Sequence, residues 1–108
     1  MKIGEIILIP FPYAEMTEKK VRPAVIITET EDKYRDLVVS AISSIVPSSL
    51  SLREIIPKPS NINNLRVESV IKVDRIVTLK RGDKLAKLGM LSAQKLAEFK
   101  NILSEMVR

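Results

Sequence analysis

Four residues of types that can act on a phosphate ester stand at the ends or edges of apolar runs. Arg22 directly precedes a proline in KKVRPAVII, so its backbone is biased toward an extended form. Its guanidinium can present a planar fork of donors to a phosphate. Ser43 lies near the end of LVVSAISS, and Lys72 and Asp74 stand two apart in IKVDRI. In a strand, that spacing puts the ammonium and the carboxylate on one face, as an acid beside a base.

Each of these positions also fits a purely structural role. Arg22 can be a surface cation paired with Glu18, and Ser43 can bond a neighbouring backbone group. Lys72 and Asp74 can form an exposed salt bridge worth about 0–1 kcal/mol. The residue types alone leave both interpretations open.

The residue types that are missing narrow the chemistry. The 108-residue chain has no Cys and no His. This composition removes disulfides and thiolate nucleophiles, together with the commonest general base and metal ligand. With three glycines, the chain has no Gly-rich phosphate cradle, and its Asp and Glu residues are scattered singly. We therefore expect no metal and no cofactor.

The charge of the chain points to a polyanionic partner. Its 18 Lys and Arg against 13 Asp and Glu give a net charge of +5. Such an excess attracts nucleic acid, although an ordinary basic surface also fits. Two Phe, two Tyr and no Trp are too few for a broad base-stacking platform.

Short strands are expected to position these residues. EIILIP and PAVIITET are almost wholly apolar, which is typical of strands covered on both faces. Further strands are predicted at DLVVSAISS, LREIIP, RVESVIKV and RIVTL, and RVESVIKV alternates between two faces. The short polar connections between most of these strands favour a small antiparallel or mixed barrel.

The C-terminal segment has a different period. In LSAQKLAEFKNILSEMVR, apolar residues recur every three or four positions, which predicts an amphipathic helix with Ser92 as its N-cap. The length fits one domain over residues 1–108, mainly β with this helix added (α+β). The first apolar run is too short for a signal peptide or a membrane span, so we expect a cytoplasmic protein without membrane contact.

The N-terminal 28 residues carry a family resemblance. GEIILIPFPYAEMTEKKVRPAVIIT resembles the N-terminal signature of the MazF/PemK toxins of type II toxin–antitoxin modules. Gly4-Glu5, an apolar strand, the turn PFPY, a polar loop and Arg22-Pro23 follow in the family's order. LVVSAISS and SVIKVDRIVTLKR are similar to later family segments, and the closing helix is in its expected place.

The resemblance implies a small SH3-like barrel of twisted antiparallel strands with a C-terminal helix, assembled as a homodimer. It implies an endoribonuclease that cleaves single-stranded RNA, including mRNA, at short sequence motifs without a metal. A cognate antitoxin is expected to neutralise it, in a complex that binds DNA. The catalytic roles carry over onto Arg22, Ser43, Lys72 and Asp74, with Ser where Thr is commoner and Lys where Arg is found. Further RNA contacts are expected at Thr17, Lys19, Lys20 and Ser44.

A mechanism for these residues uses the 2′-hydroxyl of RNA as the nucleophile. We expect Asp74 to act as its base, Arg22 to stabilise the phosphorane, and Lys72 or Arg22 to protonate the leaving 5′-oxygen. Two other functions fit the same fold: a barrel that binds RNA without cutting it, and a toxin that inhibits DNA gyrase by protein contact. The latter relies on apolar and aromatic residues near the C-terminus, and the ending EMVR lacks them.

Overall fold

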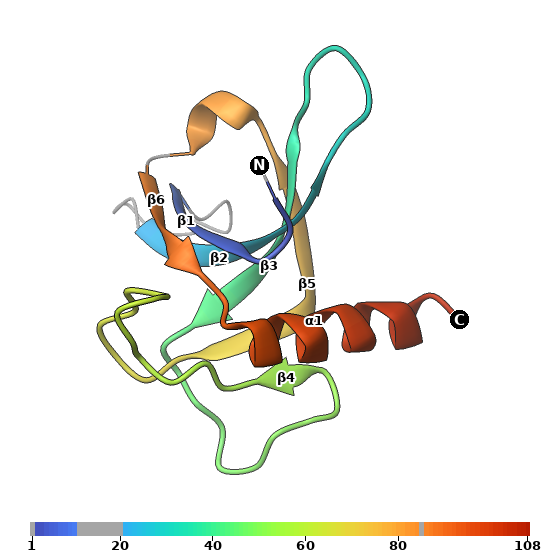
Figure 1. Cartoon of the computed structure of the whole chain (residues 1–108). Helices are drawn as coiled ribbons and strands as arrows, with labels where there is room; N and C mark the ends of the chain where they lie inside the picture. Colours follow the sequence, from blue (N-terminus) through green and yellow to red (C-terminus); the bar gives the residue numbers. More distant parts are fainter. Residues whose placement is uncertain (1, 11–20, 85) are drawn as a thin grey trace.

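The described residues of the chain form one antiparallel sheet and one C-terminal α-helix (Figure 1). The computed structural model describes residues 2–10, 21–84 and 86–108. The sheet order is β4-β5-β3-β2-β1-β6, and every pairing is antiparallel. In chain order the elements are β1 (Glu5–Pro10), β2 (Val21–Glu29), β3 (Leu37–Ser43), β4 (Glu54–Ile55), β5 (Val70–Leu79), the 3₁₀ turn η1 (Arg81–Asp83), β6 (Ala86–Met90) and α1 (Ala93–Met106).

The expected mainly-β fold with a closing helix is confirmed, but the sheet is not a closed barrel. Over the described residues, β4 and β6 are its two edges and no ladder joins them. The long strands β3 and β5 run from the end that carries α1 toward the opposite end of the molecule (Figure 1).

The central strands are buried on both faces, as their apolar runs predict. On one face Ile6, Val25 and Ile71 join a cluster that includes Phe99 of α1. On the other face a second cluster consists of Ile7, Ile9, Ala24, Ile26, Leu37 and Val39. Because successive side chains of a strand point to opposite faces, an uninterrupted apolar run serves both clusters.

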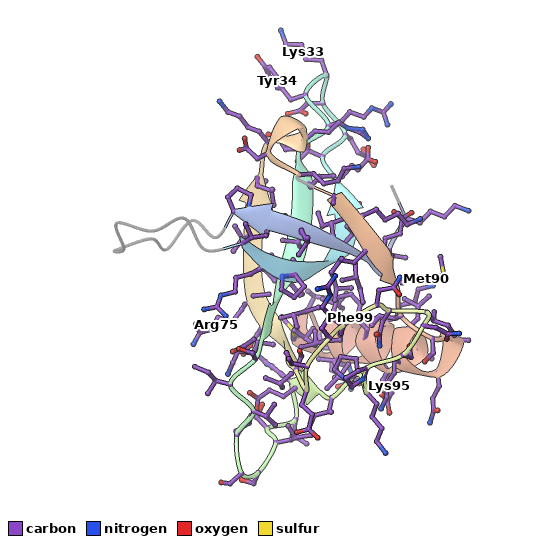
Figure 2. All side chains as sticks on the ribbon, turned by 90° about the vertical axis from the view of Figure 1, so that its left-hand side faces the viewer. Lys33, Tyr34, Arg75, Met90, Lys95 and Phe99 are labelled. Atoms are coloured by element: carbon purple, nitrogen blue, oxygen red, sulfur yellow. The ribbon has the colours of Figure 1, made fainter. Side chains whose placement is uncertain are left out.

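The predicted helix is also confirmed. The Ser92 side chain accepts a hydrogen bond from the backbone nitrogen of Lys95 at 3.3 Å and so caps the first turn. Phe99 is fully buried against the sheet (Figure 2), and Leu96 and Ile102 pack beside it. No helix in the described part of the chain is long and apolar enough to cross a membrane.

One prediction of strand boundaries was wrong, and one strand was not predicted. RVESVIKV and RIVTL form the single strand β5, which begins only at Val70, while Val67 is exposed. The strand β6, with the sequence AKLGM, was missed because Ala, Lys and Gly have low β propensity. β6 is positioned by its pairing with β1. The absence of a side chain at Gly89 allows it to lie against the Ile62 carbonyl oxygen, which a Cβ atom would overlap.

The β3–β5 ladder contains an irregularity that shapes the surface. Ser40 pairs with Ile76, but the next residue, Ala41, pairs with Lys72. Residues 73–75 therefore have no partner in β3 and form a bulge. Two other hydrogen bonds hold the backbone of Val73 in the bulge. The Val73 carbonyl accepts from Ser40 Oγ at 2.8 Å, and the Val73 nitrogen donates to the Arg53 carbonyl at 3.0 Å.

Candidate active site

A row of paired residues crosses the sheet and defines the face of the candidate site. Ala24 pairs with Ala41, Ala41 with Lys72, and Lys72 with Glu54. Directly paired residues point to the same face of a sheet. Ala24 belongs to the second cluster, so this row lies on the face opposite Phe99.

Arg22 and Ser43 extend the same face. Arg22 precedes Ala24 by two residues in β2, and Ser43 follows Ala41 by two residues in β3. Because side chains alternate along a strand, both share the face of Lys72. The small residues Ala24 and Ala41, which lie between these positions in the sheet, are both buried. The sheet thus places three of the four predicted catalytic residues on one face.

Lys72 has a carboxylate partner, but it is not the predicted one. Its Nζ atom lies 3.0 Å from Oε2 of Glu54, and the side chains are 28% and 12% exposed. The other Glu54 oxygen accepts a hydrogen bond from the backbone nitrogen of Ser51 at 2.8 Å. The Ser51 amide, followed by the Lys72 ammonium, lowers the pKa of Glu54 below its ordinary value. The salt bridge with Asp74, which was the structural alternative for Lys72, is therefore replaced by the pair with Glu54.

Asp74 occupies the bulge of β5. Its side chain is exposed, and it forms no ion pair or side-chain hydrogen bond with the residues that the structure describes. The neighbouring Arg75 projects from β5 on the side away from α1 (Figure 2). The carboxylate of Asp74 is consequently open to a ligand, whereas that of Glu54 is occupied.

Ser43 and Arg22 differ in how they are held. Ser43 Oγ accepts a hydrogen bond from the Ile45 nitrogen at 3.1 Å, as its structural interpretation allowed, and its own hydrogen remains available to an acceptor. Arg22 is half-buried, and within the described ranges its guanidinium has no ion-pair or hydrogen-bond partner. An arginine with no carboxylate beside it in that region is suited to an incoming anion.

Arg22 and Ser44 help to line a cavity of about 270 Å³ on the other face of the sheet, where Ile42 and Leu65 of the Phe99 cluster also line it. Its walls are largely apolar, with Leu8 and Val67 among them, and Arg66 adds a second positive charge. No carboxylate is among the described residues that line it. Sequence reasoning missed Arg66, whose only signal is a lone cation in NNLRVES.

The remaining predicted RNA contacts, Thr17, Lys19 and Lys20, lie outside the described residues, as does Glu18. Within the described part, no group of three or more His, Cys, Asp or Glu side chains comes together as a metal site.

Comparison with known proteins identifies the family. Residues 2–107 match the family described as PemK-like, MazF-like toxins of type II toxin–antitoxin systems. The chain belongs to this family. The predicted resemblance is therefore confirmed over almost the whole chain.

Among solved structures, this PemK/MazF-like chain is similar to an endoribonuclease in complex with its cognate antitoxin from Mycobacterial species. The two structures superpose with a TM-score of 0.72 and 14% sequence identity, over 99% of this chain and 94% of the other. At that identity the similarity establishes the fold. A comparison with curated proteins gives no significant match.

Proposed function

We propose that this toxin is an endoribonuclease that cleaves single-stranded RNA, including mRNA, at short motifs without a metal. The observation that carries the proposal is the common sheet face of Arg22, Ser43 and Lys72, in a chain of the PemK/MazF-like family. The endoribonuclease named in the similar structure has the same fold and supports this choice of reaction.

The proposed reaction uses the 2′-hydroxyl of the substrate. Asp74 accepts its proton, the 2′-oxygen bonds to phosphorus, and the bond from phosphorus to the 5′-oxygen breaks. Arg22 donates to the non-bridging oxygens as negative charge builds on the phosphorane, and Ser43 can donate its free hydrogen to one of them. Lys72 gives a proton to the departing 5′-oxygen. The products are a 2′,3′-cyclic phosphate and a 5′-hydroxyl, and atoms and charge balance without a metal.

Incubating the purified protein with a defined single-stranded RNA in the presence of a chelator tests the reaction. We expect cleavage at a few positions, with a cyclic phosphate on one fragment and a hydroxyl on the other. Products ending in 5′-phosphate, or a strict need for magnesium, would rule out this mechanism. Tight RNA binding without any product would instead favour a non-catalytic barrel.

We also propose a cognate antitoxin and a homodimer. Family membership supports an antitoxin, and Lys19, Lys20 and Arg22 concentrate positive charge in one stretch of the sequence. An acidic, partly disordered antitoxin segment gains affinity by neutralising such charges, and it competes with RNA for them.

Binding of both ligands should weaken as salt rises and in the Lys19→Glu/Lys20→Glu variant. Light scattering that shows only monomer at micromolar concentration contradicts the homodimer, and cleavage unaffected by the bound acidic peptide contradicts competition.

A further inference from the structure

We infer that Glu54 is a positioning residue, whose carboxylate holds the Lys72 ammonium in place on the face shared with Arg22 and Ser43. The inference rests on the proposed RNA cleavage and adds to it a residue on β4. Glu54 lies 18 positions before Lys72 in the chain and is brought to it only by the β4–β5 pairing.

The Glu54 carboxylate is itself fixed before it meets Lys72. One oxygen accepts from the Ser51 nitrogen at 2.8 Å, which leaves the other oxygen aimed at Lys72 Nζ at 3.0 Å. The backbone is tied in the same turn, because the Glu54 nitrogen donates to the Ser51 carbonyl at 3.3 Å. With the side chain only 12% exposed, the carboxylate offers Lys72 one defined anchor.

The backbone of Lys72 is in register with Ala41 of β3 and Glu54 of β4, but this pairing does not fix the end of its side chain. Lys72 is the last residue of β5 in register with β3 before the bulge of residues 73–75. A lysine side chain is a flexible four-carbon stem, and an unanchored one samples many rotamers. The ion pair with Glu54 selects the rotamers that keep the ammonium over the site.

The anchored ammonium still has capacity for substrate. An ammonium group carries three N–H donors, and one is directed at Glu54. Two donors remain for a phosphate oxygen or the leaving 5′-oxygen. Glu54 also places a negative charge near the RNA, so it does not favour substrate binding by charge. Neutralising Glu54 should therefore slow cleavage, because Lys72 loses its anchor. It should not weaken RNA binding, because a negative charge is removed.

A double-mutant cycle measures the positioning. Wild type, Glu54→Gln, Lys72→Ala and the double variant are compared by kcat and KM on one labelled RNA. We expect Glu54→Gln to lower kcat on the order of ten- to a hundredfold, because small misplacements of a reacting group cost that much. KM should stay level or fall. In the Lys72→Ala background the same change should cost less than about twofold, because nothing remains to position.

Glu98→Gln is the matched control, since it removes a carboxylate that pairs with Lys95 at 3.2 Å on α1. It should leave kcat and KM unchanged. The inference is overturned if Glu54→Gln leaves kcat unchanged or raises it, or if its loss is undiminished when Lys72 is already alanine.

A readout independent of activity separates this inference from the proposed reaction. In ¹⁵N-labelled protein, the Lys72 ammonium resonance should be detectable in wild type and broadened by exchange with water in Glu54→Gln. If wild type cuts no RNA, the proposed function fails. The ammonium measurement still tests whether Glu54 anchors the Lys72 side chain. The same ammonium signal in both proteins would contradict a positioning role.

Discussion

Ser40 Oγ donates to the main-chain carbonyl of Val73 at 2.8 Å, at the point where β5 leaves the β3 ladder. Ser40 is fully buried, so this hydroxyl replaces the ladder partner that the bulge takes away. The bond connects the core to the candidate site, because the bulge it stabilises carries Asp74 and the exposed Arg75.

Replacing Ser40 by Ala should destabilise the protein by about 1–3 kcal/mol, the cost of leaving a buried carbonyl unsatisfied. Urea unfolding measures the loss. Ser48→Ala, in an exposed loop position, serves as the control and should change the free energy of unfolding by less than about 0.5 kcal/mol. Equal stability of the two variants would mean that water or another donor satisfies Val73.

Replacing Arg22 by Ala should lower the rate of RNA cleavage by about two to three orders of magnitude, because the guanidinium is assigned to the charge of the phosphorane. Arg22→Lys should also cleave poorly, since an ammonium cannot form the planar fork. Cleavage is measured per folded protein, with thermal unfolding as the check on folding. Arg108→Ala, at the exposed chain end, should cleave like wild type. Full activity of Arg22→Ala would remove Arg22 from the mechanism.

Replacing Gly89 by Ala should destabilise the protein by about 1–3 kcal/mol or more, because the new methyl group overlaps the backbone of Ile62 and Asn63. Gly82→Ala is the matched control, since a Cβ there meets nothing within 4 Å. Thermal unfolding of the two variants compares them directly. A Gly89→Ala protein as stable as Gly82→Ala would show that the loop before β5 moves aside without cost.

Glu54 should contribute stability that depends on pH. Its pKa in the folded protein is lower than its ordinary value of 4.5. As pH falls below about 4.5, the unfolded chain takes up the proton first, so the contribution is lost toward the lower folded pKa. The difference in unfolding free energy between wild type and Glu54→Gln should therefore be constant near neutral pH and shrink in acid. Glu29 and Asp32, whose pKa values are also lowered, are present in both proteins. A difference that stays constant down to pH 3 would contradict the assignment.

Local signals in the sequence were sufficient for much of the fold. The periodicity of Leu96, Phe99 and Ile102 and the cap Ser92 lie within a few turns of one helix, so they predict α1 directly. The apolar runs of β1 and β2 likewise report burial on both faces. These features depend on near neighbours in the chain.

Features that depend on pairing between distant segments could not be predicted. Arg22, Ser43 and Lys72 were each identified as single residues, but their common face follows from ladder register. Glu54 lies in the predicted strand LREIIP, but its position opposite Lys72 depends on the register between β4 and β5. The bulge likewise depends on how β5 meets β3, so the sequence could not separate Lys72 from Asp74.

The order of strands in the sheet also sets when a newly made chain can finish folding. β1 is the first strand to be synthesised, yet its outer partner is β6, with Glu5 opposite Met90. Until the ribosome has released that late segment, the apolar strand EIILIP presents an unpaired edge, which is a template for association with other chains. Translation interrupted before β6 would therefore yield chains that tend to aggregate, and the sheet would be complete only after β6 has been made.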